Sequence, residues 1–214
     1  FLLKIEIDRK KEGRRMQVVK TKIFEYGDEE INYLKSVDRL LGEIIDRMGK
    51  IESIVIPDIF QALVYAIIGQ QISTKATRTI WAKLMEKSSG ITPEAIAALQ
   101  VDDIHHCGMS ANKAKYIKEL ADLVLRKEID LEALRELPDK ELIKRLSSLK
   151  GISVRSAELL LMNCFERKNV LCYGDIAIRR GLMKLYSLNE LPKEQFVVYK
   201  NRYSPYASVA SLYL

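Results

Sequence analysis

The 214-residue sequence has few of the residues that build metal clusters or disulfide frameworks. Its only cysteines, Cys107, Cys164 and Cys172, show no C-x-x-C spacing, and its only histidines, His105 and His106, are adjacent. A structural zinc site takes about four ligands, and the usual iron–sulfur cluster takes about four thiolates. We therefore expect no zinc, no iron–sulfur cluster and a reducing, intracellular environment for the thiols.

Long apolar runs are also missing. The opening stretch FLLKIEIDRKK is too short and too charged for a signal peptide, and no later stretch approaches the length of a membrane span. Internal repeats and low-complexity linkers are absent as well. These absences predict a cytoplasmic protein with no membrane partner.

The charge balance leans positive. Lysine and arginine number 35 against 29 aspartate and glutamate, which gives a net charge of +6 and a pI near 9.1. An apolar content of 48% is ordinary for a globular protein. The excess of positive charge favours a polyanionic partner, but basicity of this size is also common on ordinary protein surfaces.

The apolar pattern predicts an all-α protein. Residues 1–27 alternate apolar and charged residues, which predicts one or two short strands or the stub of a further domain. Beyond them, apolar residues recur at helical spacing and indicate about ten helices. Ser73, Ser110 and Thr92-Pro93 are placed as helix starts, and Pro57 as a first-turn proline.

The stretch SLKGISVRSAELLL, residues 148–161, predicts two helices that meet at a tight glycine turn. Gly151 permits the positive φ and the close backbone approach of such a turn. The free N–H groups at the start of the second helix, together with the helix dipole, would bind a phosphate. The pattern alone fits an ordinary helix–helix corner equally well.

Asp175 lies 24 residues after Gly151. A helix over residues 154–165 would travel about 18 Å, and an extended segment 166–174 can return up to roughly 30 Å. Asp175 can therefore return beside the hairpin, at the start of the helical stretch IAIRRGLMKLY. Taken alone, an aspartate at this position is more often a helix N-cap than a catalytic group.

The hairpin and the aspartate together resemble the helix–hairpin–helix DNA glycosylases that end in a Gly/Pro-rich loop and an aspartate (HhH-GPD). The chain keeps the leucine, first glycine, apolar residue, serine and alanine of the hairpin pattern, which are Leu149, Gly151, Ile152, Ser156 and Ala157. It departs from the pattern at Lys150, where proline is usual, and at Ser153, where a second glycine is usual. The segment VLCYGDIAIRR resembles the one that carries the family's catalytic aspartate.

The resemblance implies a role for each of these positions. Asp175 would be the catalytic carboxylate. The hairpin residues Lys150, Gly151, Ser153 and Val154 would hold a DNA phosphate. The main-chain carbonyls of Ser147, Leu149 and Gly151 would hold a monovalent cation, Na⁺ or K⁺.

Further segments resemble the 3-methyladenine DNA glycosylase II (AlkA-like) branch. In LVYAIIGQQISTKAT, the resemblance implies that Gln70 and Gln71 enter the duplex and fill the gap left by the flipped nucleotide. In RYSPYASVASLYL, it implies that the ring of Tyr203 stacks on the extruded base. Three further residues are placed in the base pocket, namely Arg155, Leu159 and Trp81.

Arg155 stands where family members that also cut the backbone carry a lysine. A guanidinium stays protonated and forms no Schiff base. The resemblance therefore implies a monofunctional glycosylase without AP lyase activity, which excises alkylated purines of the 3-methyladenine type from double-stranded DNA in base excision repair.

The implied fold is a glycosylase domain over residues 28–214, with an active-site cleft between two helical lobes, about 56–138 and 28–55 plus 139–214. The implied protein is monomeric and nucleoid-associated, with no cofactor for catalysis. Two other functions remain open: a glycosylase for oxidised or deaminated purines, and a non-catalytic DNA-binding hairpin module in which Asp175 only caps a helix.

Overall fold

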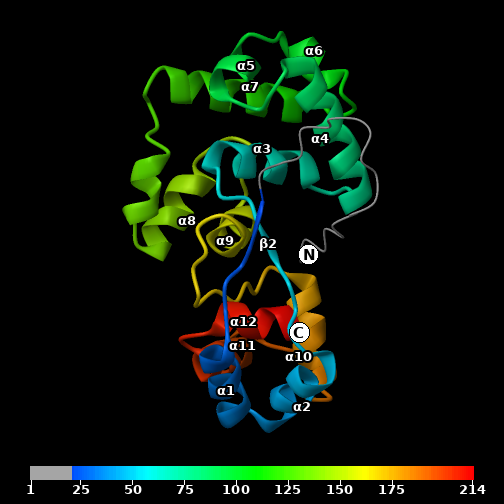
Figure 1. Cartoon of the computed structure of the whole chain (residues 1–214), viewed down its shortest axis with the longest axis vertical. Helices are drawn as coiled ribbons and strands as arrows, with labels where there is room; N and C mark the ends of the chain where they lie inside the picture. Colours follow the sequence, from blue (N-terminus) through cyan, green and yellow to red (C-terminus); the bar gives the residue numbers. More distant parts are fainter. Residues whose placement is uncertain (1–20) are drawn as a thin grey trace. The chain divides into compact units, whose positions relative to one another are not determined.

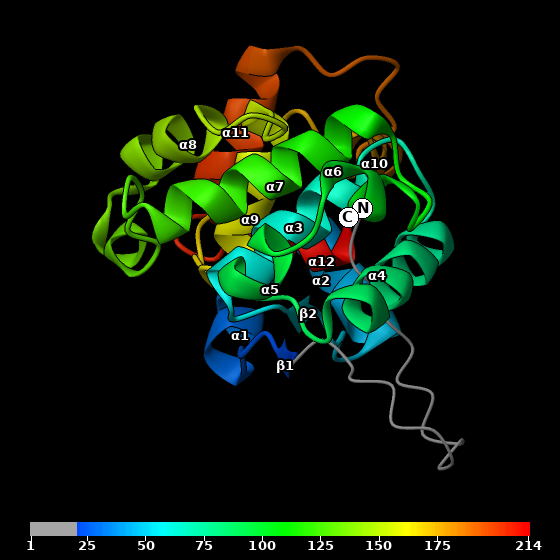
Figure 2. The ribbon, with the colours of Figure 1, turned by 90° about the horizontal axis from the view of Figure 1, so that it is seen from above.

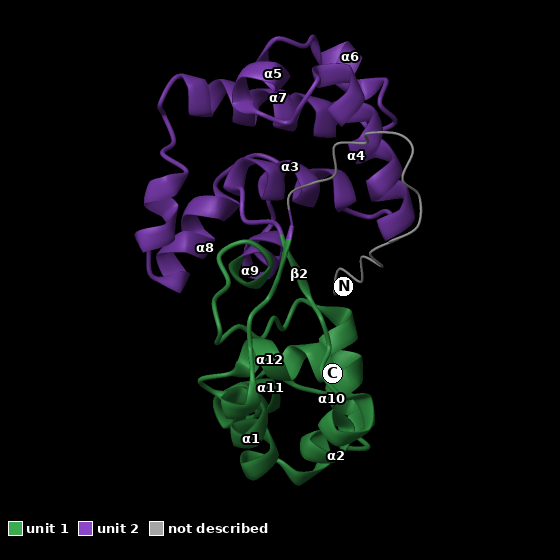
Figure 3. Cartoon of the chain, in the orientation of Figure 1, with its two compact units in different colours: residues 1–4, 22–55, 161–214 green, residues 5–21, 56–160 purple. Residues whose placement is uncertain are grey.

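The computed structural model describes residues 21–214. The predictions for residues 1–20 lie outside the described residues. The described chain forms two compact units, coloured separately in Figure 3. Unit 1 comprises residues 22–55 and 161–214, and unit 2 comprises residues 56–160.

The described residues are mostly helical, which confirms the predicted all-α class (Figure 1). Unit 1 holds α1 (Asp28–Val37), α2 (Arg39–Met48), α10 (Ile176–Leu185), α11 (Lys193–Tyr203) and α12 (Ala207–Tyr213). Unit 2 holds α3 (Ile59–Gly69), α4 (Thr74–Ser88), α5 (Pro93–Ala97), α6 (Val101–His105), α7 (Ala111–Leu125), the 3₁₀ turn Glu132–Glu136 and α8 (Asp139–Ser147). The helix α9 (Val154–Asn163) begins in unit 2 and ends in unit 1.

Two short strands of unit 1 pair antiparallel. β1 (Lys22–Ile23) lies in the segment for which the alternation predicted strands, and β2 (Ile54–Val55) precedes α3. Their register pairs Lys22 with Val55 and Ile23 with Ile54. Since only residues 21–27 of the predicted N-terminal segment are described, the remainder of that prediction is untested.

Three predicted helix starts are confirmed. The hydroxyl of Ser73 accepts a hydrogen bond from the main-chain N–H of Ala76 at 3.2 Å, at the start of α4. Ser110 caps α7 and Thr92 caps α5 in the same way, each with its N3 amide. These caps satisfy N–H groups that the first helical turn leaves without partners.

The prediction that Pro57 lies in the first turn of a helix is wrong, because Pro57 precedes the N-cap of α3. Asp58 is the N-cap of α3, with its Oδ1 accepting from the Gln61 N–H at 2.8 Å. Pro57 therefore lies just before the cap and outside the first turn. The carboxylate closes the first turn more effectively than a fixed φ alone, because it supplies an acceptor.

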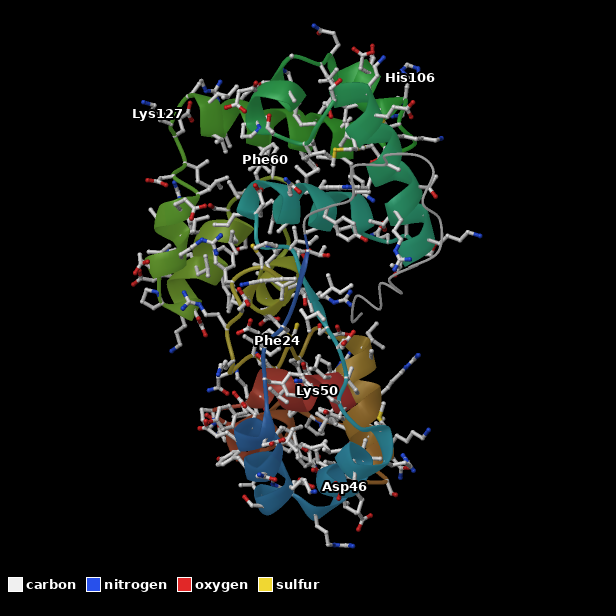
Figure 4. All side chains as sticks on the ribbon, in the orientation of Figure 1. Phe24, Asp46, Lys50, Phe60, His106 and Lys127 are labelled. Carbon is white, nitrogen blue, oxygen red and sulfur yellow. The ribbon has the colours of Figure 1, made fainter. Side chains whose placement is uncertain are left out.

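The core of unit 1 joins all its helices around buried aromatic and aliphatic residues. Phe24, labelled in Figure 4, belongs to one buried cluster with Leu34 of α1, Leu41 of α2, Leu182 of α10 and Tyr203 of α11. In unit 2, α7 packs against α3, α5 and α6, and α3 also packs against α4 (Figure 2). The α3 side chains are apolar almost all round, which suits a central helix.

Unit 2 begins where the corresponding predicted lobe begins but ends later in the chain, at residue 160 and not at about residue 138. The division near residue 55 agrees, but α8, the glycine turn and most of α9 belong to unit 2 and not with residues 161–214. Contacts to α7 explain this, because Gly151 lies against Tyr116 and Lys150 pairs with Glu119 at 2.8 Å.

Of the helices in the described residues, none is long and apolar enough to cross a membrane.

Candidate DNA-lesion site

The glycine turn between α8 and α9 has the predicted geometry. Gly151 has a φ of +84°, and the Ile152 N–H donates to the Leu149 carbonyl at 3.1 Å. A Cβ on residue 151 would lie 2.7 Å from Cδ2 of Tyr116 on α7. Glycine is therefore required here for two reasons, a left-handed backbone and a close approach of a neighbouring helix.

Ser153, the residue that replaces the usual second glycine, caps α9. Its Oγ accepts from the Ser156 N–H at 3.1 Å and lies 3.0 Å from the Ser156 hydroxyl. The side chain is exposed. The capping bond uses one of the first-turn N–H donors that a phosphate would otherwise reach. The substitution thus exchanges part of an anion site for a stable helix start.

The two glutamines between α3 and α4 have different surroundings. The Gln70 amide donates to the Gly151 carbonyl at 2.5 Å and to the Ser156 hydroxyl at 3.3 Å. Gln71 is exposed and has a φ of +60°. Gln70 therefore holds the α3–α4 turn against the glycine turn, and Gln71 is the glutamine at the exposed tip.

The carbonyls predicted to hold a monovalent cation offer suitable donor atoms. Main-chain carbonyl oxygens are ligands for such hard ions, and each has two lone pairs. The Leu149 oxygen accepts one bond, from Ile152, and the Gly151 oxygen accepts one, from Gln70. Each keeps a second lone pair for an ion, and Ser147 lies in the last turn of α8, so the donor set fits.

Among the described residues, no group of three or more histidine, cysteine, aspartate or glutamate side chains is arranged to hold a metal ion.

The other predicted site residues of unit 2 lie in the glycine turn, on α9 and on α4. Val154 and Arg155 are exposed, and Leu159 lies four residues after Arg155, on the same helix face. Lys150 is engaged by Glu119 across an exposed ion pair. Trp81 is only 5% exposed and packs edge-to-face against Tyr65, with ring centroids 5.4 Å apart. It is therefore an interior residue of unit 2.

Asp175 lies at the start of α10 in unit 1 and is 2% exposed. Its Oδ1 accepts from the Ala177 N–H at 2.9 Å, so the carboxylate caps the helix. The residues on both sides, Gly174 and Ile176, are exposed. The buried carboxylate thus follows a glycine that lies open to solvent.

Two more buried carboxylates occur in unit 1, and both belong to ion pairs. Glu30 is bound by Lys168 at 2.9 Å, and Asp38 by Arg202 at 2.8 Å. Burial raises the pKa of each carboxyl, but the hydrogen bonds that the carboxylates accept outweigh it, so both pKa values are lowered. Their charged partners give them a structural role.

The prediction for Tyr203 is not supported by the structure. Tyr203 is 0% exposed within the core of unit 1, and its hydroxyl lies 2.6 Å from that of Tyr186. Burial raises its pKa above the ordinary tyrosine value. With no exposed ring face, Tyr203 cannot stack on an extruded base in this conformation. The sequence pattern held no signal for this, since the burial comes from α1, α2 and α10.

An aromatic ring and a cation lie close to Asp175 in the sequence. Tyr173 is half-buried, packs edge-to-face on Phe196, and has the Arg179 guanidinium 5.1 Å from its ring centroid. Tyr173 and Arg179 flank Asp175 in sequence by two and four residues.

Helices joined by this glycine turn, with a following helix capped by a buried aspartate, define the chain as a helix–hairpin–helix protein. The chain belongs to the HhH-GPD superfamily of base excision DNA repair proteins, whose sequence profile matches residues 64–202. The matched range contains the glutamine turn, the glycine turn and Asp175.

Individual relatives agree with this family. DNA-3-methyladenine glycosylase 1 of Schizosaccharomyces pombe is 29% identical over 160 residues, which cover 72% of this chain and 70% of the relative. The crystal structure of a DNA-3-methyladenine glycosidase from Bacillus halodurans is similar, with a TM-score of 0.77, 28% identity and 90% of each chain covered. The S. pombe enzyme in complex with abasic DNA gives a TM-score of 0.73 at 25% identity, covering 87% of this chain and 94% of that one.

Proposed function

We propose that this chain is a monofunctional DNA N-glycosylase that excises alkylated purines, of the 3-methyladenine type, and leaves an abasic site. The observation that carries the proposal is Asp175, a buried carboxylate at a helix start beside an exposed glycine, inside the range that matches the repair family. The names of the relatives support alkylated bases as the substrate class.

The chemistry suits one carboxylate. Cleavage of an N-glycosidic bond builds positive charge on the sugar, and an ionised Asp175 stabilises that charge electrostatically. The same carboxylate can orient or deprotonate the attacking water. Alkylation makes the base cationic and weakens the glycosidic bond, so no strong general acid is needed.

The residues that would hold the DNA backbone and fill the duplex all belong to unit 2. The N–H groups at the start of α9 would bind a phosphate, with Gly151 allowing close approach and the chain at Lys150, Ser153 and Val154 surrounding it. Gln71, and Gln70 behind it, would fill the duplex where the damaged nucleotide leaves the stack, at a cost of a few kcal/mol. A Na⁺ or K⁺ held by the Ser147, Leu149 and Gly151 carbonyls would add positive charge near that phosphate.

Arg155 supports hydrolysis without strand cutting. It stands at the position from which a lysine would form a Schiff base, and a guanidinium stays protonated at neutral pH. The chain would therefore leave the backbone of double-stranded DNA intact, and we propose that it acts as a monomer. Its work would be on chromosomal DNA, as a nucleoid-associated protein of the cytoplasm.

The test is release of free methylated bases from alkylated duplex DNA, with strand breaks scored before and after alkali. We expect base release, breaks only after alkali, and no covalent complex on borohydride treatment. Breaks without alkali would overturn the monofunctional assignment. Release from 8-oxoguanine or hypoxanthine duplexes alone would instead favour oxidised or deaminated purines.

The matched variants are Asp175→Asn and Asp58→Asn. Asparagine caps a helix as well as aspartate does, so both proteins should fold. Asp58 is the N-cap of α3 and accepts from the N–H of Gln61, as Asp175 is the N-cap of α10 and accepts from the N–H of Ala177. We expect Asp175→Asn to lower base release by about 100-fold or more while DNA binding persists, and Asp58→Asn to change neither. Equal release from both variants would show that Asp175 is only a cap and would favour the binding module.

A further inference from the structure

Lys113 lies in the first turn of α7, and its ammonium group contacts the end of another helix. Its Nζ donates to the Ile68 carbonyl at 2.8 Å and to the Gln70 carbonyl at 2.7 Å. The last four carbonyls of a helix have no intrahelical partner, and a lysine near them satisfies that deficit and the helix dipole. Lys113 therefore caps the C-terminus of α3 from α7.

The end of α3 needs this support because the left-handed residue that follows the helix is Gln71 and not a glycine; Gly69 is still part of the helix. Gln70 leaves the helix with φ −63° and ψ 129°, and Gln71 takes a φ of +60°. A left-handed conformation costs a residue with a side chain about 1–2 kcal/mol. The turn is held in it from two sides, by Lys113 at the Gln70 carbonyl and by the bond from the Gln70 amide to the Gly151 carbonyl.

The surroundings of Lys113 do not suit a phosphate contact. The side chain is half-buried, and burial lowers its pKa below the usual lysine value. Two of its three N–H donors are used by carbonyl oxygens. A lysine that binds a DNA phosphate needs its charge at the surface, where it displaces condensed counterions.

We propose that Lys113 is a positioning residue for lesion recognition: it holds the turn at residues 70–72 in one conformation, so that Gln71 is presented to the duplex. The inference rests on the proposed function, because it assigns Gln71 to the gap left by the flipped nucleotide. The chain of contacts runs from α7 through the Gln70 main chain and amide to the glycine turn that would bind phosphate. One side chain thus connects the insertion turn to both supporting elements.

The test compares Lys113→Met and Lys113→Arg with Lys118→Met. Lys118 is a matched control, since it lies on the same helix, is partly buried and donates to the main-chain carbonyl of Ala97, at a different helix end. The probe is a duplex with a tetrahydrofuran abasic-site analogue beside 2-aminopurine, whose fluorescence rises when a side chain enters the stack. Gln71→Ala measures the signal without insertion.

At saturating protein we expect Lys113→Met to lose most of this rise, by roughly tenfold, and Lys118→Met to keep it. Lys113→Arg should recover a large part, because a guanidinium can also donate to two carbonyls. The salt slope of binding should be unchanged in Lys113→Met. A slope reduced by about 0.9 would make Lys113 a phosphate ligand and overturn the proposal, as would a full fluorescence rise in Lys113→Met.

Amide hydrogen exchange of the free protein gives a readout that needs no DNA. In Lys113→Met we expect faster exchange at residues 69–72 and unchanged exchange in the centre of α7, and in Lys118→Met no change at 69–72. Unchanged exchange at 69–72 in Lys113→Met overturns the proposal. Insertion by the wild type without release of any methylated base would refute the proposed function while supporting the role of Lys113.

Discussion

At the scale of single residues, Gly151 has the most demanding position in the hairpin. It combines a φ of +84° with a Cβ position 2.7 Å from the Tyr116 ring. A left-handed backbone costs a residue with a side chain about 1–2 kcal/mol. We predict that Gly151→Ala lowers the free energy of unfolding by more than this amount and weakens DNA binding. Urea unfolding and duplex binding measure the two effects.

Gly49 supplies a control without a steric neighbour. It has a φ of +66°, a ψ of −163° and nothing within 4 Å of a Cβ position, so Gly49→Ala should carry only a backbone cost, of about 1–3 kcal/mol in this glycine region. Adding Tyr116→Ala to Gly151→Ala should remove the steric part of the loss. An unchanged loss when Tyr116→Ala is added to Gly151→Ala would show that the Tyr116 contact relaxes without cost.

At the scale of elements, the start of α9 has two competing uses. The Ser153 hydroxyl occupies the Ser156 N–H, which a phosphate would otherwise receive. We predict that Ser153→Gly lowers the free energy of unfolding by only a few tenths of a kcal/mol and tightens duplex binding severalfold, because a donor is released and the backbone becomes more accessible. Fluorescence anisotropy on an abasic duplex measures the binding change.

Ser153→Ala separates the two contributions to that result. It removes the cap, at about 1 kcal/mol, but keeps a Cβ in the path of the backbone. We expect it to be less stable than Ser153→Gly and to bind less tightly. Weaker binding by both variants would instead mean that the Ser153 hydroxyl is itself a phosphate ligand.

At the scale of the whole molecule, the two units should respond differently to acid. The buried carboxylates whose pKa values are lowered, Glu30 and Asp38, both lie in unit 1, and the described part of unit 2 buries no carboxylate. A folded pKa below the unfolded value gives stability above the unfolded pKa, near 4 for Asp and Glu, and that stability is lost as pH falls through the folded pKa.

We therefore predict that unit 1 loses structure first below about pH 4. The single tryptophan, Trp81, reports on unit 2, whereas far-ultraviolet circular dichroism reports on both units. Loss of helical signal should precede the change in tryptophan emission. The variant Asp38→Asn keeps an N-cap but loses the bond between charged Asp38 and Arg202. Its free energy of unfolding at pH 7 should be lower by about 1.5–3 kcal/mol, and its stability should depend less on acid. Simultaneous acid transitions by both probes would contradict the prediction.

The sequence by itself determined the features that depend on neighbours along the chain. The helix starts at Ser73, Thr92 and Ser110 are set by a side chain and an amide three residues later. The turn at Gly151 follows from a residue without a Cβ between two apolar stretches. The position of Asp175 at the head of a helix follows in the same way, since capping is local.

Only the tertiary structure decided the features that join distant segments. The burial of Tyr203 comes from helices far away in the sequence, which turned a predicted base-stacking ring into a core residue. The assignment of the glycine turn to unit 2 and the role of Lys113 depend on contacts between α7, the end of α3 and residue 151. Periodicity specifies which face of a helix is apolar, but not which helix that face meets, because packing is decided by the shapes of both partners.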